Sequence, residues 1–368
     1  MSLGKKKMLS QGGAAAPVGT DNFNTVLYTG NGGTQSITGV GFQPDFVWGK
    51  TRNAAQGGFF VDSVRGRNSS LLPYSNSANN PNSSASNDLV SFDSDGFTVG
   101  PVEQTFLNSA HNQVAWCWKA GGAPTATNSA GAGNVPTSGS VMIDGVSSSA
   151  AVAGNVEAKK MSVNTNAQFS IVKFTSQAGA TNQVPHGLNG VPDLFIFKRT
   201  DSTESWWAYT TVIDGSLDYF SLNTDATKSD ASETAPTATT VYQPTSSSGR
   251  DYILYSFKSV DGYQKIGSYT GSSSEHSVNI GFAPRFIMIK RTDASEGWRM
   301  YDSARDGSSV PRRVNHNLQA NETSVEYDAS GDANGYFNIT STGLLFYTGN
   351  SSNGVNANGG TYIYLAIA

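Results

Sequence analysis

Aromatic and polar side chains suited to sugar binding recur in the second half of the chain. The pair Trp206-Trp207 and the single Trp298 stand at nearly equal distances after a proline in two similar stretches. Aromatic faces at a turn can stack on a sugar, while nearby Asp, Asn and Arg side chains bond its hydroxyls. The same rings would also serve to cap a sandwich or form a subunit interface, and both interpretations stay open. The candidate ligand-binding residues are Trp206, Trp207, Trp298, Tyr301 and Asp302.

Neighbouring side chains of a β-strand point to opposite faces of the sheet. Trp206 and Trp207 therefore cannot both enter one core. We expect one of them to be buried and the other to be exposed or to lie in an interface.

Catalytic and metal-binding motifs are not evident in the sequence. None of the four histidines has the spacing of a metal site, and there is no nucleophile elbow or phosphate-binding loop. The single Cys117 excludes an internal disulfide and a thiolate metal site. The stretch Asp93-Ser94-Asp95-Gly96 lacks the closing Glu of a calcium loop and is predicted to be a turn. We predict no enzyme activity, no cofactor and no metal, although a pair of carboxylates that cleaves glycans cannot be recognised from sequence.

An aspartate recurs at one position of the repeated stretches. Asp62 and Asp302 each follow a proline by 18 residues, and Thr210 takes this place in the middle copy. Such a carboxylate could bind an ion, but it more commonly accepts backbone N–H groups of a turn. His186, which precedes a glycine, is likewise predicted to be structural.

Three similar stretches, 41–66, 190–215 and 281–307, account for these spacings. In each, a proline precedes an apolar run that ends at a lysine, and a second apolar stretch follows a polar turn. Proline suits the start of a strand, and a continuous apolar run suits a buried strand. We therefore predict a β-hairpin in each copy, with the lysine marking the exit to solvent. The three lysines are Lys50, Lys198 and Lys290.

The remaining pattern predicts an all-β protein of tandem antiparallel β-sandwich modules. Gly is abundant (40 residues), only 14% of residues are charged, and no segment has a convincing helical period. Strands are expected at 114–119, 253–258 and 362–368, and the last locks the C-terminus into a sheet. The predicted organisation is an N-terminal arm (1–22), unit 1 (23–122), a linker with a short strand (123–169), and a pair of units that share a core, unit 2 (170–262) and unit 3 (263–368).

The N-terminal segment is predicted to be an extended arm. It carries Gly, Ala and a lysine triplet, has no apolar segment typical of a signal peptide, and offers little to bury. It is either a disordered tail or an anchor that orders against a partner. The candidate anchoring residues are Lys5, Lys6, Lys7, Met8 and Leu9. A net charge of −4 argues against nucleic acid as a partner, and no apolar run is long enough for membrane insertion.

Several strings resemble an uncharacterised repeat family of marine bacteriophage virion proteins, often encoded beside tail-fibre genes. In unit 1 they are 41–48, 60–66 and 115–121; in the tandem half they are 169–174, 185–188, 267–271, 291–293, 301–306 and 359–364. The resemblance covers about 23–368 and implies a lectin-like or jelly-roll β-sandwich on a phage particle. It carries no established site residues. Gly49 departs from the family pattern, where a bulky β-branched residue is expected, and Trp206-Trp207 departs within a usually polar turn.

The resemblance predicts a phage virion structural protein, tail-associated or a tail fibre, that contacts the host surface. The expected partners are other virion proteins of the tail or capsid, further copies of the chain in a homotrimer, and a host cell-surface glycan. The expected location is the virion, after synthesis in the reducing host cytoplasm. The alternatives are a capsid-decoration or head-fibre protein and a glycan-binding or glycan-degrading protein.

Overall fold

The computed structural model describes residues 19–78, 80–81, 89–101, 110–129, 134–177, 181–243, 248–332, 335–348 and 354–368. In these ranges the chain forms antiparallel sheets and two four-residue helices, α1 (Gly19–Asn22) and α2 (Ser303–Asp306). The prediction of an all-β, sandwich-like protein is confirmed. The predicted anchoring residues Lys5, Lys6, Lys7, Met8 and Leu9 lie outside the described residues.

Unit 1 pairs a four-stranded sheet with a smaller one. The large sheet has the order β1-β9-β3-β4 and the small sheet the order β2-β8-β7, and β5 and β6 form a separate pair. The strands are β1 (Phe23–Thr29), β2 (Gln35–Ile37), β3 (Phe46–Thr51), β4 (Gly58–Asp62), β5 (Ser69–Ser70), β6 (Asn80–Pro81), β7 (Leu89–Asp93), β8 (Gly96–Val99) and β9 (Asn112–Trp118).

Unit 2 contributes to a nine-stranded sheet of order β11-β10-β12-β13-β20-β15-β16-β17-β18, and β14 pairs with β19. The first three strands of that order come from the segment 123–169, and β10 pairs with β12 in parallel. The strands are β10 (Val141–Ile143), β11 (Val146–Ser147), β12 (Ala158–Asn164), β13 (Phe169–Thr175), β14 (Asn182–Pro185), β15 (Leu194–Arg199), β16 (Trp207–Thr210), β17 (Asp218–Ser221), β18 (Ser229–Asp230), β19 (Thr240–Gln243) and β20 (Asp251–Phe257).

Unit 3 has a six-stranded sheet of order β21-β30-β23-β24-β26-β27 and a four-stranded sheet of order β22-β29-β28-β25. The C-terminal strand lies between two neighbours, as the sequence predicts. The strands are β21 (Gln264–Thr270), β22 (His276–Asn279), β23 (Phe286–Arg291), β24 (Arg299–Asp302), β25 (Arg312–Val314), β26 (His316–Gln319), β27 (Tyr327–Asp328), β28 (Phe337–Thr340), β29 (Gly343–Phe346) and β30 (Thr361–Ile367).

The same four strands recur in the large sheet of every unit. The strand after the proline pairs with its hairpin partner on one side and with the closing strand of the unit on the other, and the opening strand covers the far edge of the closing strand. Because side chains alternate along a strand, each large sheet presents an inner and an outer face.

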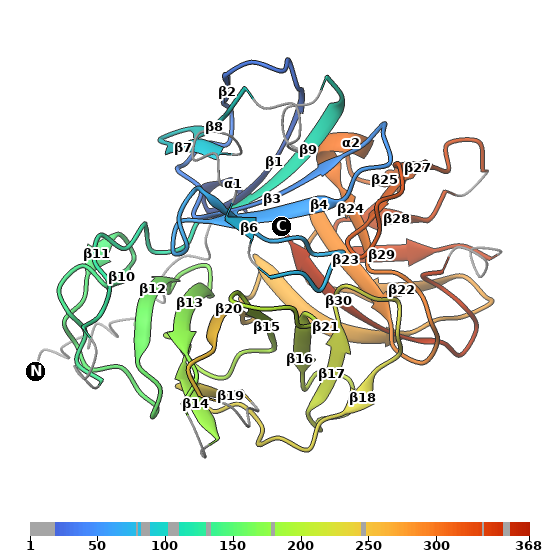
Figure 1. Ribbon diagram of the computed structural model, residues 1–368. Coiled ribbons are helices and arrows are strands. Elements are labelled where there is room, and N and C mark those ends of the chain that lie inside the picture. Colours follow the sequence, from blue (N-terminus) through green and yellow to red (C-terminus); the bar gives the residue numbers. More distant parts are fainter. Residues whose placement is uncertain are drawn as a thin grey trace, which may run out of the picture.

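The inner faces of all three large sheets meet in one core at the centre of the molecule (Figure 1). Phe46 of unit 1, for example, lies with its ring centroid 4.9 Å from that of Tyr255 of unit 2, and Phe23 lies 5.3 Å from Phe286 of unit 3. Each outer face packs in a separate core of its own unit. The shared core predicted for units 2 and 3 thus also includes unit 1.

The three repeat lysines are fully buried, so the prediction that they mark an exit to solvent is wrong. Each ammonium group instead donates hydrogen bonds to backbone carbonyls. Lys50 Nζ reaches Glu322 O of unit 3 at 2.6 Å, Lys198 reaches Asn76 O of unit 1 at 3.2 Å, and Lys290 reaches Asp225 O of unit 2 at 3.1 Å. The lysines therefore join the units in a closed cycle. Burial lowers the pKa of each ammonium to about 8.

Candidate binding pockets on the outer sheet faces

One cross-strand pair on the outer face occupies the same place in every unit. It joins Gly49 to Phe59 in unit 1, Phe197 to Trp207 in unit 2, and Ile289 to Arg299 in unit 3. The backbone around these pairs is alike, so differences in side chain decide whether the place is filled or open.

In unit 1 the place is filled. A Cβ atom at Gly49 would lie 1.9 Å from Cζ of Phe59, so only glycine leaves room for this ring. Phe59 is 3% exposed and packs in the outer core of unit 1. The glycine at position 49 therefore has a packing cause: the neighbouring strand supplies the bulk that Phe197 and Ile289 supply at the equivalent position of the other units.

In unit 2 the place is a pocket of about 300 Å³. Four aromatic rings and three carboxyl groups contribute to its wall, together with Ser232 and Gln243. Two pairs of rings meet at steep angles: Trp207 lies 5.6 Å from Tyr219 with an interplanar angle of 74°, and Phe197 lies 6.1 Å from Tyr209 with an angle of 78°. Tyr209 and Tyr219 meet at 38°. The rings are those of Phe197, Trp207, Tyr209 and Tyr219, and the acids are Glu204, Asp230 and Glu233.

In unit 3 the corresponding pocket measures about 430 Å³, and most of its wall residues are polar or charged. Arg299 stands where unit 2 has Trp207, and its partner Gln319 in β26 stands where unit 2 has Ser221 in β17. Asn317, two residues before Gln319, therefore takes the place of Tyr219. The wall residues are Arg299, Asn317, Gln319, Glu322, Ser324, Val325, Glu326, Tyr327 and Tyr336.

Three buried polar atoms of the unit 3 pocket have no hydrogen-bond partner in the described part of the chain. They are Nε of Arg299, Oδ1 of Asn317 and Oε1 of Gln319. Asn317 is only 2% exposed, and its amide nitrogen donates to the Tyr336 hydroxyl at 3.3 Å. A buried polar group without a partner is costly, so such atoms on a pocket wall indicate that water or a polar ligand bonds them.

A tyrosine stands at the rim of the same pocket. Tyr327 is 60% exposed, and it is the one aromatic side chain in the exposed class among the residues that the structure describes. Exposed aromatic rings beside a polar pocket are typical of binding surfaces, because their faces offer apolar area at little conformational cost.

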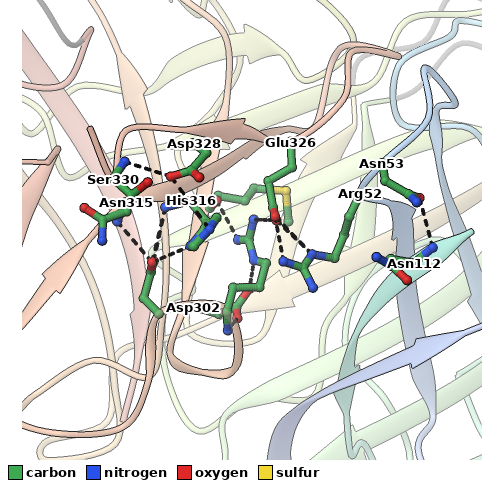
Figure 2. Close-up of polar contacts among 12 residues, drawn as sticks. Arg52, Asn53, Asn112, Asp302, Asn315, His316, Glu326, Asp328 and Ser330 are labelled. Carbon is green, nitrogen blue, oxygen red and sulfur yellow. Dashed lines mark hydrogen bonds and ion pairs between the residues drawn. The ribbon is translucent and has the colours of Figure 1, made fainter. Parts of the chain in front are cut away.

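An ion-pair chain supports the wall of the unit 3 pocket and ties it to unit 1 (Figure 2). Glu326 receives Arg52 of unit 1 at 2.6 Å and Arg305 at 3.0 Å, and Arg305 also bonds Asp302 at 2.7 Å. Burial works against ionisation of Glu326, but hydrogen bonds from Arg52 and the charge of Arg305 outweigh it and lower its pKa. The carboxylate is thus held by two guanidinium groups and is fixed in place.

Beside this chain, His316 forms a second polar contact (Figure 2). Its Nδ1 lies 2.6 Å from a carboxylate oxygen of Asp306, which also accepts the backbone N–H of Asn315 at 3.1 Å. These bonds fix the turn that leads into β26, the strand that carries Asn317 and Gln319.

The sequence-predicted ligand residues are not brought together in one site. Trp206 and Trp298 are buried between units, where their indole N–H groups donate to Leu72 O of unit 1 at 3.0 Å and to Ser221 O of unit 2 at 3.2 Å. Tyr301 and Asp302 are also buried, at 1% and 3% exposure. Of the five residues, Trp207 lines the unit 2 pocket, and the other four line neither this pocket nor the unit 3 pocket. The expectation that the two adjacent tryptophans do not enter one core is confirmed: Trp206 lies in the central core, whereas Trp207 is half-buried against the outer core of unit 2.

The recurring aspartates accept backbone N–H groups, as the sequence predicts. Asp62 accepts from Arg65 N at 2.8 Å, and Asp302 accepts from Arg305 N at 3.0 Å. Each also accepts a hydrogen bond from another unit: Tyr255 OH of unit 2 donates to Asp62 at 2.8 Å, and Trp116 Nε1 of unit 1 donates to Asp302 at 2.9 Å. These carboxylates thus serve packing between units.

His186 is fully buried, and it is hydrogen-bonded on both ring nitrogens. Leu188 N donates to its Nδ1 at 3.1 Å, and its Nε2 lies 3.3 Å from Thr237 O. Burial lowers its pKa to about 4, so the ring is neutral at pH 7. In the described ranges no group of three or more His, Cys, Asp or Glu side chains is arranged to hold a metal ion, and no helix is long and apolar enough to cross a membrane.

Most pocket residues have no signal in the sequence. Asn317, Gln319 and Tyr327 lie in a stretch of unit 3 that has no close counterpart in the other copies, and Glu233 lies in a polar stretch of unit 2. Glu204 could have been singled out, because Glu204 and Glu296 both follow their proline by 12 residues. That repetition predicts an acid at one position of both hairpins. Which pocket the acid lines follows only from the fold.

Comparisons with known proteins place the chain in one family. The family model described as a domain of unknown function (DUF7483) matches residues 18–144 and 142–368. The first segment covers unit 1, and the second covers units 2 and 3. No curated protein and no solved structure matches the chain. With nearly all of its length matched, the chain belongs to the DUF7483 family of domains of unknown function.

Proposed function

We propose that the protein is a structural protein of a bacteriophage particle, tail-associated, that binds a glycan of the host surface through the unit 3 pocket. The virion assignment is supported by the resemblance of the repeated strings to phage virion proteins. The binding role is supported by the pocket itself. We further propose that the particle carries the chain as a homotrimer, with the arm anchored in a neighbouring virion protein.

The observation that carries the glycan proposal is the unpaired Oδ1 of Asn317 on a pocket wall beside the exposed ring of Tyr327. A sugar hydroxyl would donate to Oδ1 of Asn317. Adjacent hydroxyls of the same sugar would bond Oε1 of Gln319 or Nε of Arg299. The C–H face of the same sugar would lie on the tyrosine ring. Planar amide and guanidinium groups around one aromatic ring match a ligand that has polar edges and an apolar face.

The binding role is tested on a glycan array with the full chain and two variants of one residue. Tyr327→Ala removes the stacking face from an exposed position, so folding should be unchanged and binding should weaken about tenfold or more. Tyr327→Phe keeps the face and should retain most of the affinity. Val310→Ala, at another exposed apolar position of unit 3 (44% exposed), is the matched control. Silence of the wild-type chain on the array, or equal binding by Tyr327→Ala, would remove the pocket from consideration.

The virion assignment needs a separate experiment. Intact particles would be labelled with an antibody against residues 170–368 and imaged by electron microscopy. Label at the tail supports the proposal, whereas label over the head would indicate a capsid-decoration or head-fibre protein. Particles without label would contradict the virion assignment and leave a free glycan-binding protein.

A further inference from the structure

The unit 2 pocket has chemistry opposite to that of the unit 3 pocket at the same position of the fold. In unit 3 the carboxylate of Glu296 pairs with Arg299 of the same hairpin at 3.0 Å. In unit 2 the equivalent acid is Glu204, but Trp207 replaces the arginine. Unit 3 thus supplies its own cation at this place, and unit 2 supplies an aromatic ring.

Two acids of the unit 2 pocket have no ion-pair partner among the described residues. The carboxylate of Glu204 accepts a hydrogen bond from Tyr252 OH at 3.1 Å, and Glu233 has no cation within ion-pair distance. Lys198 lies near but donates to the backbone carbonyl of Glu204 at 2.8 Å. The third acid, Asp230, is paired with Lys228 at 3.0 Å. The wall therefore carries two carboxyl groups outside any ion pair, although the charges of Lys198 and Arg199 also act on Glu204.

Two cations outside the wall, Lys228 and Arg199, pair with other acids. Lys228 also pairs with Asp218 at 2.6 Å and with Asp214 at 3.1 Å, and Arg199 pairs with Asp201 at 2.6 Å. Burial raises the pKa of Tyr209, and the nearby carboxyl groups of Glu233 and Glu204 raise it further.

We propose that the unit 2 pocket binds a compact organic cation, an alkylammonium group such as a quaternary ammonium. Aromatic faces attract a cation through their quadrupole, and cages of such rings are the common protein solution for quaternary ammonium ligands. Four rings line the space, two pairs of them at steep angles, and Glu204 and Glu233 supply the counter-charge. This proposal does not depend on the virion assignment or on glycan binding in unit 3.

The chemistry of the wall favours an organic cation over a metal ion. Calcium and magnesium take six or more oxygen ligands at short distance. Here four of the nine wall residues are aromatic, and the carboxylates come from separate elements. Methyl groups on nitrogen suit this surface, because they make apolar contact with the rings while the charge remains.

The test is isothermal titration of the full chain with tetramethylammonium and with choline, at constant ionic strength. The comparison ligand is the neutral carbon isostere of choline, in which carbon replaces nitrogen. We expect saturable binding of both cations and binding of the isostere weaker by about tenfold or more, because the cation–π attraction requires charge. Trp207→Ala should reduce cation binding by about the same factor, and Trp207→Phe should restore part of it.

Two controls separate the proposal from general electrostatics. Asp261→Asn removes a negative charge at an exposed position of unit 2 outside the pocket wall and should leave the affinity unchanged. Thermal unfolding of each variant checks that the fold persists. No saturable binding of either cation by the wild-type chain would overturn the proposal. Equal binding of the isostere, or full binding by a folded Trp207→Ala variant, would overturn it as well.

Discussion

At one equivalent place on the outer sheet face, Phe59 of unit 1 packs over Gly49, whereas Trp207 of unit 2 and Arg299 of unit 3 line pockets. The inner faces behave differently. All three units keep a buried lysine that donates to a carbonyl of another unit. The comparison shows that the duplicated scaffold repeats the contacts that hold the units together and varies the side chains that face outward.

The corner of the hairpin is a second difference between units. Units 1 and 3 have a buried pair there, Asp62 with Arg65 and Asp302 with Arg305. Unit 2 has Thr210, whose hydroxyl donates to Asp193 O at 2.7 Å. The contacts of unit 1 with units 2 and 3 thus include a buried carboxylate, while the corner of unit 2 is neutral.

The largest predicted effect follows from this corner. Asp302→Ala leaves the buried Arg305 with one acid fewer and leaves the Trp116 N–H unpaired, so the free energy of unfolding should fall by about 3–5 kcal/mol. Thr210→Ala at the equivalent place should cost about 1 kcal/mol, because it removes one neutral hydrogen bond. Equilibrium denaturation of both variants measures the difference. Equal losses would contradict the distinction between the corners.

A smaller effect is expected at the filled place of unit 1. Gly49→Val puts branched atoms into the Phe59 ring and should lower the free energy of unfolding by about 1–3 kcal/mol. Phe59→Ala alone leaves a cavity and should cost about 3–5 kcal/mol. Because valine refills part of that cavity, the double variant should be more stable than the sum of the two losses implies. Additive losses, measured by denaturation, would mean that the two side chains do not compete for one space.

The smallest effect tests the shared inner face through its pH dependence. The pKa of each repeat lysine is about 8 in the folded chain, against 10.5 for an ordinary lysine. Between pH 8 and pH 10.5 the unfolded chain binds more protons than the folded chain, so the free energy of unfolding rises with pH in this window. The gain is lost again as pH falls through 8. From pH 7 to pH 9 each lysine should add about 1 kcal/mol.

Single variants divide this rise among the units. Lys50→Met, Lys198→Met and Lys290→Met should each reduce the rise in unfolding free energy between pH 7 and pH 9 by a similar amount. Denaturation at the two pH values gives the slope for each variant and for the wild-type chain. A slope that only one variant changes would mean that the lysines are not equivalent.

The repeat and the all-β fold were predictable because apolar runs, prolines and glycine-rich turns record strand and turn positions locally. The burial of the lysines was not, since a lysine at the end of an apolar run gives no sign that a carbonyl of another unit receives it. Trp206 and Trp298 were misleading for the same reason: their partners, Leu72 and Ser221, come from distant segments. The pocket residues Asn317 and Glu233 come from strands and loops outside the repeated strings, so the fold alone brings them to the pockets.

The most direct test of the account is a crystal structure of the full chain grown with the strongest ligand from the glycan array. The account predicts a sugar in the unit 3 pocket, with a hydroxyl bonded to Asn317 Oδ1 and a face on Tyr327, and no sugar at Phe59 of unit 1. A sugar bound at a different surface, with Asn317 Oδ1 still unpaired, would contradict the assignment of the outer faces of the later units to binding.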